Sequence, residues 1–138
     1  GSTSTAAGAA CVGEEMTVLI TGDMSFSYDV NGLSSTYLSP RFKIIVMCNG
    51  GGGIFRFIKP TSDLPELETC FEIHRDISVE KYADLFGLRY FELNDEKSAA
   101  EVLSLFFAEK DRPAILAVHT PNVYNAEVLR GYFRRSRQ

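Results

Sequence analysis

The fold of this chain is decided at Thr21-Gly22-Asp23-Met24-Ser25 and at Cys48-Asn49-Gly50-Gly51-Gly52-Gly53. Each segment directly follows an apolar run, residues 16–21 and residues 42–48, that is typical of a buried parallel strand. An acidic side chain and an amide side chain therefore stand where two strands end and two loops begin. Open α/β sheets bind their ligands at this edge, so we expect a ligand site there.

The donors at this edge suit a magnesium ion that also holds phosphate groups. Asp23 offers a carboxylate, Asn49 an amide oxygen and the glycines an open backbone, and Mg²⁺ commonly combines such oxygen ligands with substrate phosphates. A helix that begins near Met24 and Ser25 would add free N–H groups and the positive end of a helix dipole. Four successive glycines favour conformations closed to other residues, so they indicate either close approach to a ligand or a flexible turn.

The composition is that of an ordinary globular protein. The chain has 138 residues, 45% of them hydrophobic and 23% charged, which is enough for one domain with its own core. A net charge of −4 argues against a nucleic-acid-binding protein. Three scattered cysteines suit neither a disulfide framework nor a zinc site, so we expect reduced thiols in the cytoplasm. The sequence shows no signal peptide and no apolar run long enough to span a membrane.

The remaining sequence predicts helices that alternate with strands, which is typical of an α/β fold with a mainly parallel sheet and right-handed crossovers. Further strands are expected at residues 88–93 and 113–119. Gly87 is expected to end one helix, and Asn94 or Asp95 to cap the next. Four segments have apolar residues at helical spacing: Phe26, Val30, Leu33 and Tyr37; Val79, Tyr82, Ala83 and Phe86; Ala99, Val102, Leu103 and Phe106; and Val128, Leu129 and Tyr132. The last set is expected to be the buried side of the final helix. Arg134, Arg135 and Arg137 are expected at the end of that helix, where they suit the negative end of its dipole.

The chain begins with a helix of small residues. Ser2-Thr3-Ser4-Thr5 offers N-cap residues, and the alanines and glycine of residues 6–10 would let the helix lie close to a sheet or a partner. A helix that opens an α/β unit normally has a strand before it. We therefore expect that the first strand is missing, and that residues 1–138 form a single domain from a longer protein.

Two features of the middle of the chain stay open at the level of sequence. Ile54-Phe55-Arg56-Phe57-Ile58 follows the glycine loop directly, and it either lines a pocket or anchors the loop in the core. His74 lies in a loop of residues 61–75 that is rich in helix breakers, where histidine more often makes a structural hydrogen bond than acts in catalysis.

Gly22-Asp23, followed one strand-helix-strand unit later by Cys48-Asn49, resembles the thiamine-diphosphate motif Gly-Asp-Gly…Asn-Asn. Met24 replaces the last glycine of that motif, and Cys48 replaces the first asparagine. The wider segments, residues 22–33 and 49–55, are more specific. They resemble the C-terminal, diphosphate-binding domain of the 2-succinyl-5-enolpyruvyl-6-hydroxy-3-cyclohexene-1-carboxylate synthases (MenD) of menaquinone biosynthesis, from about Thr3 to the end of the chain. This resemblance implies a three-layer thiamine-diphosphate-binding fold.

The resemblance also implies a site that takes thiamine diphosphate and Mg²⁺, with Mn²⁺ able to replace the magnesium. Its metal ligands would be the Asp23 carboxylate, the Asn49 side-chain oxygen and the Gly51 carbonyl. Residues expected at the cofactor are Gly22, Met24, Ser25, Gly52 and Ile54, and residues expected at the substrate are Phe55 and, by its charge and place alone, Arg56 as a carboxylate contact.

In this family the reaction removes carbon dioxide from 2-oxoglutarate and adds the remaining carbanion to isochorismate. The glutamate that activates the cofactor belongs to a separate N-terminal domain of another subunit. The resemblance therefore implies a transferase that works with its N-terminal and middle domains as a homodimer or homotetramer, and a segment that holds no catalytic residue and is inactive alone. The expected ligands are small molecules, with no nucleic acid and no membrane.

Two other interpretations remain. A different thiamine-diphosphate enzyme, such as an acetolactate synthase or a pyruvate decarboxylase relative, would share the metal residues and differ at residues 54–58. The second is a nucleotide-binding or purely structural interaction domain with a glycine loop. A mononucleotide-binding domain would take ATP without preferring thiamine diphosphate and Mg²⁺.

Overall fold

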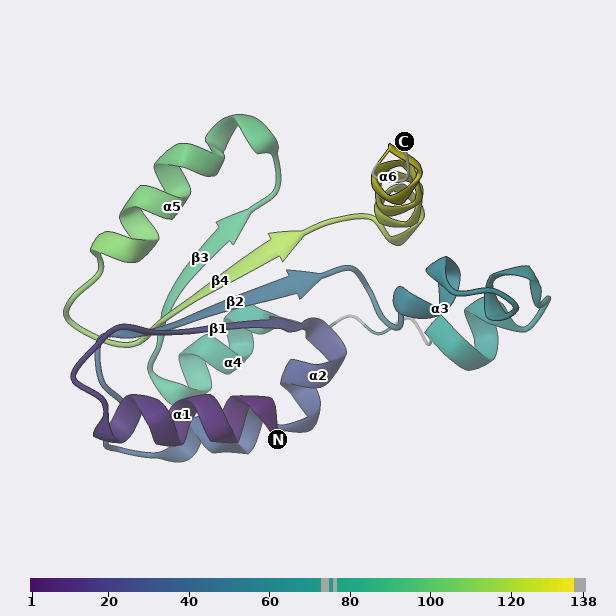
Figure 1. The fold of residues 1–138 in the computed structure, drawn as a ribbon. Helices are drawn as coiled ribbons and strands as arrows, with labels where there is room; N and C mark the ends of the chain where they lie inside the picture. Colours follow the sequence, from purple (N-terminus) through teal and green to yellow (C-terminus); the bar gives the residue numbers. More distant parts are fainter. Residues whose placement is uncertain (73–74, 76, 136–138) are drawn as a thin grey trace.

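Four strands form one parallel sheet in the order β1-β2-β4-β3 (Figure 1). The structure is a computed structural model and describes residues 1–72, 75 and 77–135. The strands are β1 (Thr17–Gly22), β2 (Phe42–Cys48), β3 (Arg89–Leu93) and β4 (Ala114–His119). All three pairings between neighbouring strands are parallel, so the predicted α/β class is confirmed.

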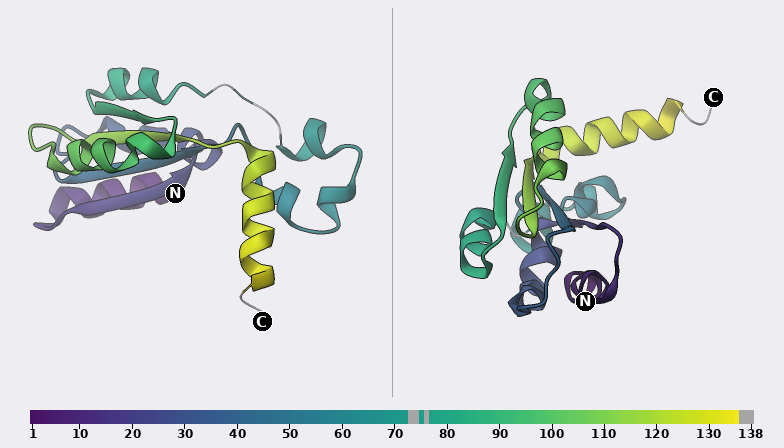
Figure 2. Two further views of the ribbon diagram at one scale, coloured as in Figure 1. Left: turned by 90° about the horizontal axis from the view of Figure 1, so that it is seen from above. Right: turned by 90° about the vertical axis from the view of Figure 1, so that its left-hand side faces the viewer.

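Helices cover both faces of this sheet, which gives three layers (Figures 1 and 2). One face carries α1 (Ser2–Val12), α2 (Asp23–Tyr28), the 3₁₀ helix η1 (Val30–Ser34) and α4 (Val79–Phe86), and the other carries α5 (Ala99–Ala108). Beyond the C-terminal ends of the strands lie α3 (Ile54–Phe57), η2 (Thr61–Asp63), η3 (Leu67–Glu72) and α6 (Asn122–Arg135); η4 (Glu96–Ser98) precedes α5.

The core lies on the two faces of β2 and β4. Ile44 and Val46 of β2 pack into the cluster under α1, α2 and α4, whereas Ile45 packs with α5. The same alternation holds on β4, where Ile115 faces the first cluster and Leu116 faces the second. A parallel strand between two helical layers buries both of its faces, which explains why these runs are apolar throughout.

The first helix lies close to the sheet, as its small residues predicted. Ala7 and Ala10 are buried in the core, and the Asp29 carboxylate accepts hydrogen bonds from the Ser4 amide (2.8 Å) and the Ser4 hydroxyl (2.5 Å). These bonds hold the first turn of α1 against the junction of α2 and η1. The predicted serine and threonine N-caps are wrong, because Gly1 is the N-cap and residues 2–5 already lie within the helix.

The helix predicted after Asp23 is shorter than its apolar pattern suggested. It ends at Tyr28, and Asp29, with φ −129° and ψ 21°, leaves the helical conformation before η1 begins. Tyr37 lies outside both helices and is 81% exposed, so its predicted place on the buried face is wrong. The Asp29 side chain bonds across to α1, and this tertiary contact accompanies the break.

The last helix does not pack on the sheet (Figure 2). Val128 is 50% exposed and Tyr132 is 62% exposed, so the buried side predicted for this helix is wrong. α6 instead contacts α3, where the rings of Phe57 and Phe133 lie 5.9 Å apart and Arg130 Nη2 donates to the Arg56 carbonyl at 2.5 Å. Two residues with predicted roles, His74 and Arg137, lie outside the described residues.

The described helices include none that is both long enough and apolar enough to cross a membrane. Cys11, Cys48 and Cys70 are all free thiols, and Cys48 is the one that is partly buried.

Candidate functional site

The pairing of the strands brings the two decisive segments to one edge of the sheet. Gly22 at the end of β1 pairs with Met47 near the end of β2. Asp23 follows the first strand directly and Asn49 follows the second. The two segments therefore end at the same edge of the sheet, while the meeting of these two side chains around a metal ion stays a prediction.

Asp23 bridges the two segments through its carboxylate. It is only 4% exposed, and its Oδ1 accepts from the Met24 amide while its Oδ2 accepts from the Gly50 amide, both at 2.8 Å. Two backbone donors compensate the burial of this carboxylate. Each carboxylate oxygen keeps a further lone pair that a cation can take.

The glycine loop needs its glycines for two different reasons. Gly50 and Gly51 have φ values of 81° and 139°, a region that other residues rarely adopt. Gly53 has an ordinary φ of −55°, yet a Cβ there would lie 2.4 Å from Asn122 Oδ1 and 2.9 Å from Asn49 Nδ2. The loop is thus shaped by conformation at its start and by close packing at its end.

A cavity of about 310 Å³ opens beside the Asp23 carboxylate. It is lined by Asp23, Cys48, Gly50, Ile77 and Ser78 and by the basic side chains Arg75, Lys81 and His119. Burial, reinforced by the Asp23 charge, raises the pKa of the Cys48 thiol to about 11, so the thiol is neutral at pH 7. A cavity with one carboxylate and several basic side chains suits an anionic ligand that has a cation bound to it.

A second cavity, of about 300 Å³, brings together three residues that were predicted for the cofactor and the substrate: Met24, Gly52 and Phe55. Phe55 packs against Phe71 with ring centroids 5.5 Å apart. Gly22 ends β1 as the N-cap of α2. Ile54 is 55% exposed and Ser25 is also exposed, and neither lines this cavity.

Arg56, whose role as a substrate contact stays a prediction, pairs with two carboxylates of this chain. Its Nε donates to Glu72 Oε1 at 2.7 Å, and its Nη2 donates to Glu72 Oε2 at 2.6 Å and to Glu68 Oε1 at 2.9 Å. These bonds, those to Glu72 above all, raise the pKa of Arg56. The Glu72 carbonyl also accepts from the Gly52 amide at 2.8 Å. Arg56 therefore braces the glycine loop and does not present a free guanidinium to a ligand.

The predicted ligand set fits a metal only together with phosphate. Within the described residues, no group of three or more histidine, cysteine, aspartate or glutamate side chains could hold an ion. Asp23, Asn49 and Gly51 supply one carboxylate and two neutral oxygens. Mg²⁺ prefers six oxygens and often completes its shell with phosphate oxygens and water. The donors therefore suit a metal–diphosphate unit rather than a bare ion.

Two residues of this region were missed at the level of sequence. Asn122 begins α6 just beyond β4, and it is only 7% exposed. The strand-end argument that found Asp23 and Asn49 could have found Asn122 too, because it also follows a strand. Glu72, which is fully buried beneath Arg56, has no comparable signal, since an acid in a loop normally faces solvent.

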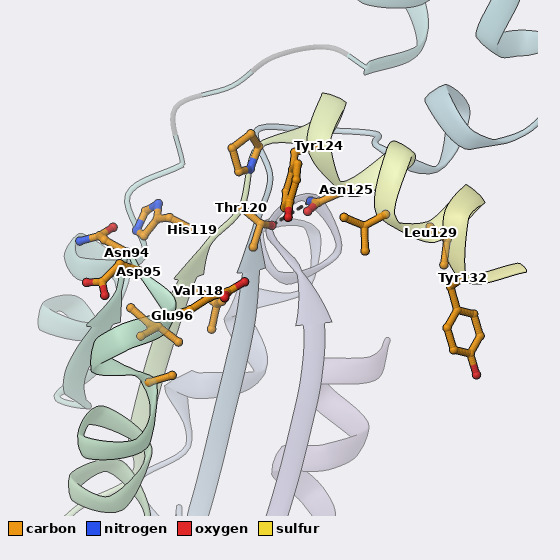
Figure 3. Close-up of a pocket in the computed structure, with 14 residues that line it drawn as sticks. Asn94, Asp95, Glu96, Val118, His119, Thr120, Tyr124, Asn125, Leu129 and Tyr132 are labelled. Atoms are coloured by element: carbon orange, nitrogen blue, oxygen red, sulfur yellow. Dashed lines mark hydrogen bonds between the residues drawn. The ribbon is translucent and has the colours of Figure 1, made fainter. Parts of the chain in front are cut away.

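A larger cavity, about 660 Å³, lies elsewhere, between the start of α5 and α6 (Figure 3). Asn94, Asp95 and Glu96 lie on one side of it, and Tyr124, Leu129 and Tyr132 of α6 lie on the other. None of the predicted site residues lines it. His119 borders both this cavity and the one at Asp23, and its Nε2 lies 3.0 Å from Glu92 Oε1.

Comparison with known proteins shows which proteins this chain is similar to. No family model matches the chain. Curated relatives named 2-succinyl-5-enolpyruvyl-6-hydroxy-3-cyclohexene-1-carboxylate synthase do match. The protein from Porphyromonas gingivalis is 48% identical over 96% of this chain, that from Flavobacterium johnsoniae 42% identical over 97%, and that from Christiangramia forsetii 38% identical over 96%.

The matches cover nearly all of this chain and only 23–24% of the length of these relatives. The residues singled out above, 22–33 and 49–55, fall inside a match that leaves at most a few residues of the chain uncovered. The chain belongs to the family of the 2-succinyl-5-enolpyruvyl-6-hydroxy-3-cyclohexene-1-carboxylate synthases, of which it spans about a quarter of the length.

Proposed function

We propose that this chain holds the magnesium ion and the diphosphate of thiamine diphosphate in a synthase of this family. The observation that carries the proposal is the contact of the Asp23 carboxylate with the Gly50 amide, which joins the two motif segments at a buried point above β1 and β2. An acid and an amide at adjacent strand ends, beside an open glycine backbone, are the donors that a metal–diphosphate unit requires.

Each residue has a distinct part in this proposal. The Asp23 carboxylate, the Asn49 side-chain oxygen and the Gly51 carbonyl would hold Mg²⁺, or Mn²⁺ in its place. Gly22, Met24, Ser25 and Gly52 would bind the diphosphate, and Ile54 and Phe55 would lie toward the reactive ring and the substrate. When bound, thiamine diphosphate supplies the electron sink for decarboxylation, while the protein supplies binding and electrostatics.

The activity of the whole protein follows from the family as a proposal. The full-length enzyme would remove carbon dioxide from 2-oxoglutarate and join the remaining fragment to isochorismate, in the pathway to menaquinone. The activating glutamate and the rest of the substrate site would come from N-terminal and middle domains, in a homodimer or homotetramer. This chain, as the C-terminal domain, would bind and orient without turning over substrate alone.

The test compares the full-length protein with the isolated chain. With 2-oxoglutarate, isochorismate, thiamine diphosphate and Mg²⁺, the full-length protein should release carbon dioxide and form the succinyl-cyclohexene product, and the isolated chain should do neither. Formation of acetolactate from pyruvate by the full-length protein would instead identify another thiamine-diphosphate enzyme. Turnover by the isolated chain would contradict the proposed division between domains.

A nucleotide-binding domain is the remaining alternative, and a calorimetric competition separates it. The full-length protein should bind thiamine diphosphate with Mg²⁺, and millimolar ATP should not displace it. Displacement by ATP at equal concentration would favour a general nucleotide site.

A further inference from the structure

Three neighbouring strands, rather than two, end in polar side chains at this edge. Asp23 follows β1, Asn49 follows β2 and Asn122 follows β4, and these strands are adjacent in the sheet order. The Thr120 amide donates to the Cys48 carbonyl at 3.0 Å, so the residue after β4 is still bonded to the last residue of β2. The entry to α6 is therefore fixed beside the glycine loop.

Asn122 is buried without using its amide. It is 7% exposed, and both its Nδ2 and its Oδ1 are inaccessible to solvent and lack a hydrogen-bond partner among the described residues. Folded proteins pair most buried polar groups, because an unpaired one loses its bonds to water and gains nothing in exchange. A buried amide of this kind at the edge of a ligand site indicates a partner that the fold alone does not supply.

The direction of this amide is set by the glycine loop. Asn122 Oδ1 and Asn49 Nδ2 converge on Gly53, each within 3 Å of the point that a Cβ there would occupy. The Asn122 oxygen, an acceptor, and the Asn49 nitrogen, a donor, therefore lie on either side of the space that the missing side chain of Gly53 leaves open. The Asn49 Oδ1, in turn, accepts a long hydrogen bond of 3.3 Å from the Gly51 amide.

We propose that Asn122 is a positioning residue for the metal site: when the ion is bound, Asn122 Oδ1 accepts a hydrogen bond from Asn49 Nδ2, so that Asn49 Oδ1 is held toward the ion. This rests on the proposed function, in which Asn49 is a metal ligand. An amide has its oxygen and nitrogen on opposite sides, so fixing the nitrogen fixes the direction of the oxygen. Residues that orient a metal ligand commonly change metal affinity about 10- to 100-fold when removed.

The experiment measures Mn²⁺ affinity in the full-length protein, with thiamine diphosphate present, by electron paramagnetic resonance of free Mn²⁺. Asn122→Ala should weaken Mn²⁺ binding by about 10- to 100-fold. It should leave the Tm of the cofactor-free protein unchanged, because it removes no hydrogen bond present there. Asn122→Ser, which is smaller yet polar, serves as a second variant if the alanine variant folds poorly.

The matched control is Asn125→Ala on the same helix. Asn125 Nδ2 donates to Thr120 Oγ1 at 2.9 Å (Figure 3), so this variant should lower the Tm and keep the affinity for Mn²⁺. A double variant tests the route of the effect. If Asn122 acts through Asn49, then Asn122→Ala should cost no further affinity in an Asn49→Ala background.

Two outcomes would overturn the inference alone, and both are distinguishable from a third, the failure of the proposed function. Unchanged Mn²⁺ affinity in both Asn122 variants, with normal binding by the unmodified protein, removes Asn122 from the site and leaves the proposed function standing. If the losses of Mn²⁺ affinity in the two single variants multiply in the double variant, Asn122 does not act through Asn49. Absence of Mn²⁺ and cofactor binding by the unmodified protein overturns the proposed function itself.

Discussion

At Gly53, the space available for a side chain limits the choice of residue, whereas backbone conformation does not. Gly53→Ala would fit the φ of −55° and still drive a methyl group into the amides of Asn49 and Asn122. We expect a loss of about 1–3 kcal/mol in the free energy of unfolding, as for other overpacked sites. Gly131→Ala is the control, because a Cβ at that helical position meets no atom within 4 Å and should stabilise α6 by about 0.5–1 kcal/mol.

Chemical denaturation of the two variants measures this contrast. Equal stability of the Gly53 and Gly131 variants would show that the loop yields to the added methyl group, and the close approach of the two asparagines would then lose its importance.

The Asp29 carboxylate should make the free energy of unfolding fall as the pH becomes acidic. Hydrogen bonds from the Ser4 hydroxyl and the Ser4 amide lower the pKa of Asp29 from 3.8 to about 2. Because the folded pKa is depressed, its contribution is present above pH 4 and is lost as the pH falls from about 4 to 2. Urea unfolding between pH 2 and 5 should show an acid-dependent loss that is smaller in Asp29→Asn. An identical pH profile for the variant would contradict the contact with α1.

At the scale of elements, Arg56 and Glu72 join α3 to η3 and so fix the loop between β2 and α3. Arg56→Ala removes two hydrogen bonds that the fully buried Glu72 carboxylate accepts. We expect the free energy of unfolding to fall by about 2–4 kcal/mol, slightly less than for fully buried ion pairs, because Arg56 is partly exposed.

Thermal unfolding and the affinity for thiamine diphosphate should both report this change, because the Gly52 amide bonds to the Glu72 carbonyl. Arg41→Ala, at an exposed arginine, should change stability by less than about 0.5 kcal/mol. A small effect of Arg56→Ala on stability, together with a large rise in KM for 2-oxoglutarate alone, would restore the original prediction of a substrate contact.

Local chemistry made several elements predictable. Gly87 ends α4 with a φ of 69°, and Asp95 caps the next turn by accepting from the amides of Lys97 and Ser98. Both signals act within a few residues, so the sequence carries them directly. The juxtaposition of Asp23 and Asn49 was predictable for a similar reason, since parallel strands end at a common edge.

Features that depend on distant partners were not predictable. Asp29 leaves the helical conformation where it bonds to Ser4, 25 residues earlier, and no local pattern encodes that contact. Arg56 looked like a free charge because its partner Glu72 lies 16 residues away, at the end of η3, in a segment whose sequence predicts a loop. The stripe of α6 was found, but periodicity says which residues share a face and not what covers that face.

At the scale of the whole molecule, α6 carries large apolar side chains that are at least one-third exposed. They are Val123, Tyr124, Val128, Leu129, Tyr132 and Phe133. Exposed apolar groups of this extent commonly mark an interface. Because the relatives are about four times as long as this chain, we expect the remainder of the full-length protein to cover this helix.

The isolated chain should therefore self-associate in sedimentation experiments, and Val128→Ser combined with Tyr132→Ser should reduce that association. In the full-length protein, amides of α6 should exchange with solvent more slowly than in the isolated chain. A strictly monomeric isolated chain whose α6 exchanges at the same rate in both proteins would contradict a covering role for the other domains.

Asp23, Asn49 and the glycine loop should together hold a metal–diphosphate unit, and calorimetric titration of the full-length protein with thiamine diphosphate tests this most directly. Binding should require Mg²⁺, and Asp23→Asn should weaken it by at least about 100-fold, whereas the exposed Asp63→Asn should leave it unchanged. Tight binding without Mg²⁺, or equal affinity in the Asp23 and Asp63 variants, would contradict the account.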